Sequence, residues 1–124
     1  MAKALDNSVY DAALAKLATS VNVTLCSAQP ANRAGIAAVA LATGTHTSGL
    51  GNGSYTVANG DTSGRKVTIA ALSNLSVAAN GTATHVAYDD GTTLLAVTTC
   101  ASTALSSGGT VSIGAHKLEI QAPT

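Results

Sequence analysis

The chain has 124 residues, and its six basic and six acidic side chains give a formal net charge of zero. A chain of this length is expected to form one domain, because two domains would each be too small to bury a proper core. The sequence lacks the basic stripe that is typical of nucleic-acid-binding proteins, so we expect no nucleic-acid partner.

Hydrophobic residues make up 46% of the chain, whereas aromatic residues make up only 2%. Phe and Trp are absent, and Tyr10, Tyr55 and Tyr88 are the three aromatic residues. An aromatic side chain buries roughly 150–250 Å², and Ala, Val, Leu and Ile must supply the core instead. We therefore expect a marginally stable monomer, or a homo-oligomer that gains stability by burying surface between its copies or against a partner.

Residues 8–19 are predicted to form an N-terminal helix. Ser8 and Asp11 have the spacing of a capping box, in which Ser8 caps the first turn and Asp11 reaches back to it. An apolar stripe at helical spacing follows, and its members are Tyr10, Ala13, Leu14, Leu17 and Val21.

Alternating β-branched residues next predict a strand over Val21–Cys26. The segment Asn32–Ala42 is ambiguous, since Ala-rich Arg33–Ala38 suits a short helix whereas Ala38–Thr43 suits a strand. Small and polar residues then predict a loop, a short strand and a second loop, at Gly44–Gly53, Tyr55–Ala58 and Asn59–Gly64.

The stretch Ser63–Val97 is predicted to form four short strands in succession. Its turns lie at Asn, Asp and Gly residues that favour positive φ angles, namely Asn74, Asn80-Gly81 and Asp89-Asp90-Gly91. The alternation in this stretch places three apolar side chains on one face of the first strand: Val67, Ile69 and Ala71. A small-residue loop is predicted over Ala101–Gly109, and a last strand over Thr110–Ala122, broken near Gly114.

One helix and seven or eight sequential strands with short turns are typical of all-β folds. The sequence therefore predicts a single, mainly β domain over residues 1–124. Its expected architecture is an antiparallel β-sandwich or a jelly-roll-like barrel with one N-terminal α-helix.

The longest nearly apolar run, Gly35–Ala42, is far shorter than the roughly 20 residues that span a bilayer. Met1–Asp6 also lacks the apolar core of a signal peptide. We expect no membrane partner and synthesis in a reducing cytoplasm. Free, buried thiols at Cys26 and Cys100 are then favoured over a disulfide.

The side chains that catalysis needs are scattered along the chain. His46, His85 and His116 are too far apart in sequence for a zinc motif, although distant histidines can converge in a fold. Asp89 and Asp90 fall in a predicted turn, and a Gly-x-Ser-x-Gly nucleophile motif is absent. We expect no catalytic residues, no metal, no cofactor and no enzymatic activity.

The order of these segments resembles the small virion structural proteins of tailed bacteriophages, in particular head decoration (cement) proteins. After the N-terminal helix, the matching segments are Leu25–Pro30, Asp61–Thr68, Gly81–Ala87 and Leu94–Ala96. The chain departs from the family pattern at Gln29, where an acidic residue is usual, and at Val86, where an aromatic residue is usual.

The resemblance implies a β-rich sandwich that forms dimers or trimers and binds the outside of an assembled icosahedral head. The partner would be the major capsid protein, whose neighbouring subunits the protein bridges. The location would be the capsid surface of the virion, after synthesis in the host cytoplasm. The candidate contact segments are the N-terminal helix or its preceding arm Ala2–Asp6, and the loops Thr43–Gly53 and Asn59–Gly64. The candidate residues are Ala2, Lys3, Leu5, His46, Leu50, Tyr55, Asp61 and Arg65.

Three other functions remain open at the level of sequence. A tail or fibre component would share every compositional feature discussed above. A carbohydrate-binding or adhesin module would need aromatic rings on which sugars stack, and the chain has three tyrosines. An enzyme would require the distant histidines to converge in the fold.

Overall fold

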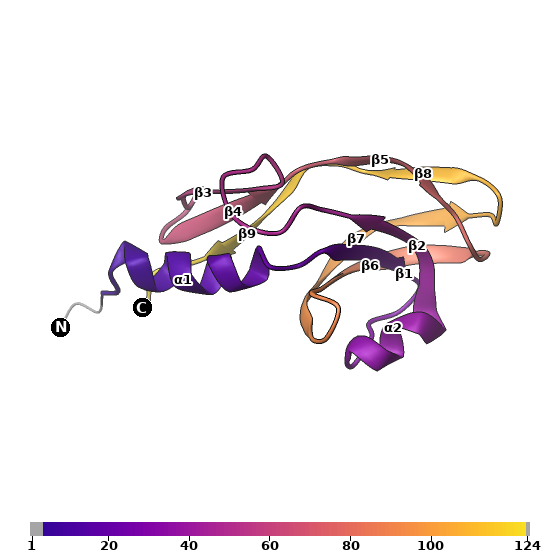
Figure 1. Cartoon of the computed structure of the whole chain (residues 1–124), viewed down its shortest axis with the longest axis horizontal. Coiled ribbons are helices and arrows are strands. Elements are labelled where there is room, and N and C mark those ends of the chain that lie inside the picture. The colour runs from indigo at the N-terminus through magenta and orange to yellow at the C-terminus, as the bar shows by residue number, and fades with distance from the viewer. Residues whose placement is uncertain (1–3, 124) are drawn as a thin grey trace.

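The computed structural model describes residues 4–123, so the predicted contact residues Ala2 and Lys3 lie outside the described part of the chain. Two helices and nine strands are present in residues 4–123 (Figure 1). In chain order they are α1 (Asn7–Leu17), β1 (Asn22–Cys26), α2 (Arg33–Val39), β2 (Ala40–Thr45), β3 (Tyr55–Asn59), β4 (Arg65–Ile69), β5 (Leu72–Ser76), β6 (Gly81–Asp89), β7 (Leu94–Leu105), β8 (Thr110–Ile113) and β9 (His116–Ile120).

All strand pairs in the described sheets are antiparallel. A four-stranded sheet has the order β2-β1-β6-β7, a three-stranded sheet the order β3-β4-β9, and β5 pairs with β8 alone. The predicted mainly β fold with an N-terminal helix is confirmed, and these sheets do not close into a barrel.

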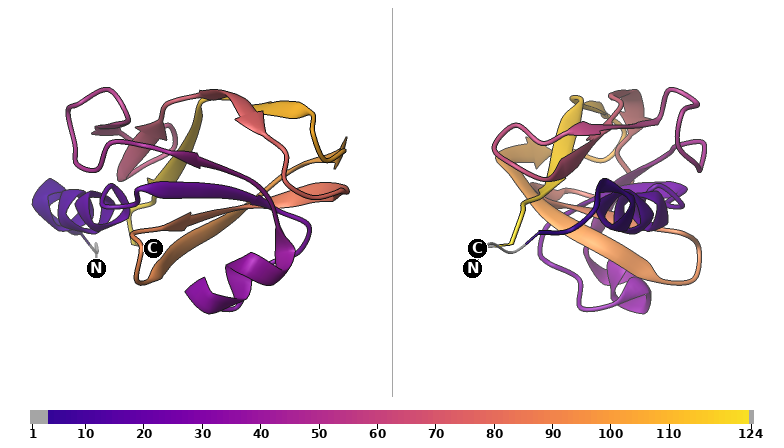
Figure 2. Two further views of the ribbon diagram at one scale, coloured as in Figure 1. Left: turned by 45° about the vertical axis from the view of Figure 1, so that its right-hand side comes forward. Right: turned by 90° about the vertical axis from the view of Figure 1, so that its left-hand side faces the viewer.

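The hydrophobic core lies between the four-stranded sheet and the two smaller sheets (Figure 2). Val23 of β1 and Val86 of β6 pack in one cluster with Val67 and Ile69 of β4, and α1 adds Leu14. Aliphatic side chains and two buried tyrosines thus fill the core.

The opposite face of the four-stranded sheet is also covered. Cys26, Ala87 and Ile36 of α2 form a smaller buried cluster there. Since α2 covers one face of β1 and the main core covers the other, four of the five residues of this strand are buried.

The two helices differ from the sequence prediction of a single helix capped by Ser8. The N-cap of α1 is Asp6, whose carboxylate accepts hydrogen bonds from the Ser8 amide at 2.9 Å and the Ser8 hydroxyl at 2.5 Å. The ambiguous segment forms both elements in turn: α2, capped by the Asn32 side chain, runs directly into β2. Neither helix in residues 4–123 is long and apolar enough to cross a bilayer.

The predicted succession of hairpins in the centre of the chain is wrong, although four strands do form there. Of the four, only β6 and β7 pair with each other as neighbours in sequence, through the Asp89–Gly91 turn, whereas β4 and β5 belong to different sheets. Asn74 adopts φ 58° but lies within β5, at an irregularity of its pairing with β8. Ala71, predicted to share the face of Val67 and Ile69, is exposed between β4 and β5.

The C-terminal third contains a further correction. The predicted loop over residues 101–109 is only partly confirmed. Because β7 continues to Leu105 and pairs along β6 as far as Gly81, the loop is confined to residues 106–109. The predicted break near Gly114 is confirmed. It separates β8, which pairs with β5, from β9, which pairs with β4.

Candidate interaction surface

The predicted contact segments that the structure describes gather around α1 and the β3–β4 strands, at one end of the molecule (Figure 1). We call this region the helix-end surface and define it as residues 4–9, 46–54 and 59–65. Contacts of α1 with β4 and with the β2–β3 loop hold these parts of the chain together.

An ion pair attaches α1 to β4. Arg65 Nε donates to Asp11 Oδ1 at 2.8 Å, and Arg65 Nη2 donates to Asp11 Oδ2 at 3.3 Å. The remaining guanidinium nitrogen, Nη1, donates to Asn59 Oδ1 at 2.8 Å. Arg65, a predicted contact residue, is therefore engaged in internal contacts that position the helix. Asp11 bonds to Arg65 and does not take the predicted role in a capping box.

The loop between β2 and β3 is attached to the other end of α1. The amide of Gly49 donates to the carbonyl of Ala18 at 2.8 Å. Within the loop, Asn52 Nδ2 donates to the Ser48 carbonyl at 2.8 Å, and the Ser54 amide donates to Asn52 Oδ1 at 3.1 Å. These bonds hold the loop in one shape and present Leu50, whose side chain is 41% exposed.

Tyr55 and His46 lie beneath this loop. Tyr55 is completely buried, and its hydroxyl donates to the Ser20 carbonyl at 2.9 Å. Burial raises the pKa of Tyr55 and lowers the pKa of the half-buried His46, whose ring lies 5.4 Å from the tyrosine ring. The proposed contact role of Tyr55 does not fit its position, because its side chain belongs to the core.

The loop between β3 and β4 carries a small charged network. Asp61 accepts from Lys66 Nζ at 2.6 Å and from Lys117 Nζ at 2.5 Å. These two hydrogen bonds, chiefly the one from Lys117, lower the pKa of Asp61 to about 2. Glu119 Oε1 of β9 accepts hydrogen bonds from the amides of Asp61 and Thr62, which attaches the loop to β9. Asp61 remains exposed at the surface.

Large exposed apolar side chains lie at both ends of α1: Leu5 and Val9 at its N-terminal end, and Leu50 in the loop that Gly49 bonds to Ala18 at its C-terminal end. Leu5 is 49% exposed and Val9 is 51% exposed, and with Leu50 they are the large hydrophobic residues that stand out from the surface among residues 4–123. Leu5 and Leu50 were predicted as contact residues, whereas Val9 was missed. Val9 lies four residues after Leu5 and outside the apolar stripe that contains Tyr10 and Leu14. This position in the sequence indicates an apolar side chain on the exposed side of the helix.

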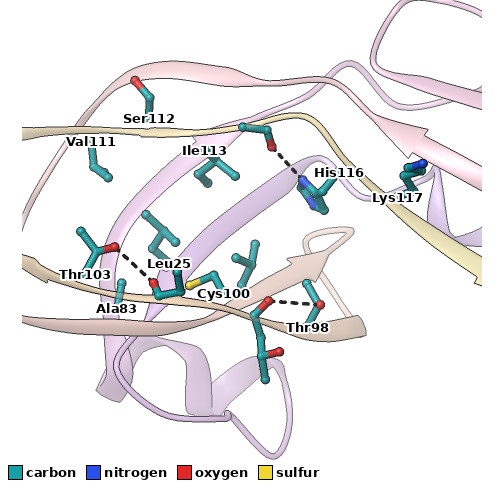
Figure 3. A pocket seen from close by; sticks show the side chains of 14 residues that line it. Leu25, Ala83, Thr98, Cys100, Thr103, Val111, Ser112, Ile113, His116 and Lys117 are labelled. Carbon is teal, nitrogen blue, oxygen red and sulfur yellow. Dashed lines mark hydrogen bonds between the residues drawn. The ribbon is translucent and has the colours of Figure 1, made fainter.

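A cleft of about 390 Å³ lies between β7 and the β8–β9 segment (Figure 3). Its floor is apolar and includes Leu25, Val86 and Ile113, while Thr98, Cys100 and Thr103 of β7 line one side. The two edges do not pair across it, since β7 pairs with β6 alone in residues 4–123.

The cleft contains a thiol and an imidazole, but neither is arranged for nucleophilic chemistry. Burial raises the pKa of Cys100, so its thiol stays protonated and is a weak nucleophile near neutral pH. His116 Nδ1 lies 3.0 Å from the Gly114 carbonyl, and His116 Nε2 contacts the Tyr88 hydroxyl. Both ring nitrogens are thus engaged. His85 is half-buried and hydrogen-bonded to Thr84.

The remaining titratable groups have structural roles. Asp89, predicted to lie in a turn, is buried at the end of β6 and accepts from Asn22 Nδ2 at 3.0 Å, Arg33 Nε at 3.3 Å and the Gly91 amide at 2.9 Å. It joins β1, α2 and the β6–β7 turn.

Cys26 and Cys100 are free thiols, of which Cys26 is buried. In the described part of the chain, no three His, Cys, Asp or Glu side chains are grouped to hold a metal ion.

Comparison with known proteins finds no matching family model, no matching curated protein and no matching solved structure.

Proposed function

We propose that the protein binds the outside of an assembled bacteriophage head and stabilises it by bridging neighbouring capsid subunits. The observation that supports this proposal is that the large exposed apolar side chains among residues 4–123, Leu5, Val9 and Leu50, all belong to the segments of the helix-end surface. Exposed large apolar side chains mark interaction sites when they gather in one region of a protein surface. The partner would be the major capsid protein.

The helix-end surface is suited to binding because its parts are held in place before any partner arrives. The Arg65–Asp11 pair positions α1, and the Gly49–Ala18 bond attaches the loop that carries Leu50. Prior ordering reduces the conformational entropy that binding would otherwise remove. Each copy could then bind weakly and still be retained, since contact with two capsid subunits raises the effective concentration.

The same proposal includes the finer architecture of a decoration-type β-sandwich. One core shared by the four-stranded sheet and the two smaller sheets supports this description. It also includes a location on the capsid surface of the virion and a homo-oligomeric state. A binding role that needs no cofactor is consistent with the engaged His116 and the protonated Cys100.

The decisive experiment adds the purified protein to undecorated heads and locates the added density by cryo-electron microscopy. We expect density outside the head, between neighbouring subunits, with α1 facing the capsid. Leu5→Ser and Val9→Ser should each lower the affinity by about tenfold or more, because each removes about 1.5–3 kcal/mol of buried apolar contact.

The matched control is Ala38→Ser, an exposed position on α2 away from the helix-end surface. It should bind heads like the parent protein. Heads that retain no protein at saturating concentration would contradict the proposal. Particles made without the protein that have normal heads but lack tails would instead favour a tail component.

A further inference from the structure

The four-stranded sheet ends at β7, the longest strand of the described chain, with 12 residues. β7 pairs with β6 on one side, and no strand within residues 4–123 pairs with its other side. Such an edge presents backbone N–H and C=O groups that can pair with another chain.

Apart from a bulge at Cys100–Ser102, the free edge of β7 lacks the features by which natural proteins prevent such pairing. The segment Leu94–Leu105 contains no charged residue, no proline and no glycine. By contrast, β9 on the other side of the cleft carries Lys117 and Glu119. Edge strands that must stay unpaired are commonly short, or carry lysine or proline, so β7 is the edge that is open to association.

On the other side of the molecule, the four-stranded sheet is linked to the layer that contains β5. Ala42 of β2 forms a bridge with Val77, which directly follows β5, and the Ala78 amide donates to the Leu41 carbonyl at 2.8 Å. The two layers are therefore linked at this side, whereas the cleft separates β7 from the β8–β9 segment.

The regular part of the edge is short but sufficient for pairing. From Ala96 to Thr99, β7 follows β6 without interruption, whereas Cys100–Ser102 form a bulge opposite Thr84. A bulge bends an edge and restricts pairing beyond it. The contact is thus expected to centre on Ala96–Thr99.

We propose that two copies of this chain pair through the Ala96–Thr99 edges of β7, antiparallel across a twofold axis. The two four-stranded sheets join into one continuous sheet, and each copy covers the mouth of the other's cleft. The partner is a second copy because the edge carries no charge and meets its identical counterpart without repulsion. Lys117, the charged residue that lines the cleft, is already paired with Asp61 at 2.5 Å.

This contact uses a different part of the molecule from the helix-end surface. It does not depend on the proposed capsid-binding role. A twofold edge contact uses the same residues on both copies and closes at two, so it predicts a dimer.

The test measures the mass of the full chain by sedimentation equilibrium over a range of concentrations. The parent should form a dimer, and Thr99→Lys should raise its dissociation constant by about tenfold or more, because a lysine on an edge strand opposes pairing with another chain. Thr56→Lys is the matched control, since Thr56 is an exposed threonine on β3, away from the cleft. It should leave the dissociation constant unchanged.

Hydrogen exchange provides a second readout, in case Thr99→Lys alters folding. Amides of residues 96–99 in the parent and in Thr56→Lys should exchange more slowly at high concentration than at high dilution. A parent that stays monomeric, a trimer, or an oligomer with no concentration-dependent protection at 96–99 would overturn the proposal. Protection that develops only on heads, with a monomer in solution, would assign the edge to a capsid segment instead.

Binding of Thr99→Lys to heads separates this inference from the proposed function. A monomeric Thr99→Lys that still decorates heads supports the dimer contact and leaves capsid binding intact. If the parent dimerises through β7 but binds no heads, the dimer contact stands and the decoration role fails.

Discussion

At the scale of single residues, hydrogen-bonding partners distinguish two predicted contact positions, Tyr55 and Arg65, from exposed surface residues. Tyr55 and Arg65 looked like surface residues in the sequence, one in a short strand and one at a strand end. Tyr55 is completely buried and its hydroxyl donates to the Ser20 carbonyl, whereas Arg65 is partly buried and bonded to Asp11. Neither partner lies near its residue in sequence, so local pattern could not reveal these contacts.

Asp61 gives the clearest dependence on pH. Its pKa is lowered from 3.8 to about 2 in the folded protein by Lys117 and Lys66. A carboxyl group with a lowered folded pKa adds stability above its unfolded pKa, and this stability is lost as the pH falls toward the folded value. We therefore expect the parent to lose more of its unfolding free energy than Asp61→Asn between about pH 5 and pH 2.

Urea unfolding at a series of pH values measures this difference. Because the Asp61 cluster is exposed, about 1 M NaCl should screen its ion pairs and bring the parent closer to Asp61→Asn. Equal losses in the two proteins at low salt would show that Asp61 contributes nothing to the acid response. Asp6, Asp90 and Glu119 also have lowered pKa values, so the variant should keep part of the acid sensitivity.

At the scale of elements, the ends of strands were easier to predict than their partners. Alternation and turn residues predicted strands near β4, β6 and β9, and glycine marked the break between β8 and β9. The pairing of β4 with β9 joins Val67 to Leu118, which are 51 positions apart. Such a pairing is selected by the shared core, which places apolar faces together, and not by the residues between the strands.

The attachment of α1 is an element-scale prediction. Arg65→Ala should lower the unfolding free energy by about 1–3 kcal/mol, since it removes charge-assisted bonds to Asp11 and leaves that carboxylate unpaired. Arg65→Lys should cost less but more than nothing, because lysine keeps the charge without the two-pronged geometry. Urea unfolding followed by circular dichroism measures both.

The control for this prediction is Lys16→Ala. Lys16 lies 3.9 Å from Asp90 and its side chain is 67% exposed, so its ion pair is weak. We expect a change of no more than about 0.5 kcal/mol. The proposed role of Arg65 fails if its alanine variant is no less stable than Lys16→Ala.

At the scale of the whole molecule, one core unites nearly all the elements. The main cluster contains side chains from α1, the four-stranded sheet and both smaller sheets, and α2 alone is buried against a separate cluster. With few aromatic residues, stability depends on many small aliphatic contacts spread over this common core. No single element can then retain its packing after the others are lost.

The molecule should consequently unfold in one cooperative transition. In Thr99→Lys, where dimer formation is weakened, urea curves from far-ultraviolet circular dichroism and from tyrosine fluorescence should coincide. The calorimetric and van't Hoff enthalpies should also agree. An early transition confined to the helical signal would show that α1 or α2 folds independently of the sheets.

The sequence by itself determined the class of the protein and the local elements. Period-two alternation marked strands, helical spacing marked α1, and Asp-Gly marked the β6–β7 turn, because each of these signals acts between residues close in the chain. It also placed Leu5 and Leu50 in segments that turned out to be exposed.

Only the tertiary structure decided which strands pair, which candidate residues are buried, and which sheet edge is left open. The positions of Tyr55 and Arg65 depend on contacts with Ser20 and Asp11, which are distant from them in sequence. The free edge of β7 exists because β8 and β9 pair with β5 and β4. These outcomes follow from burying one shared core, and burial is a property of the whole chain.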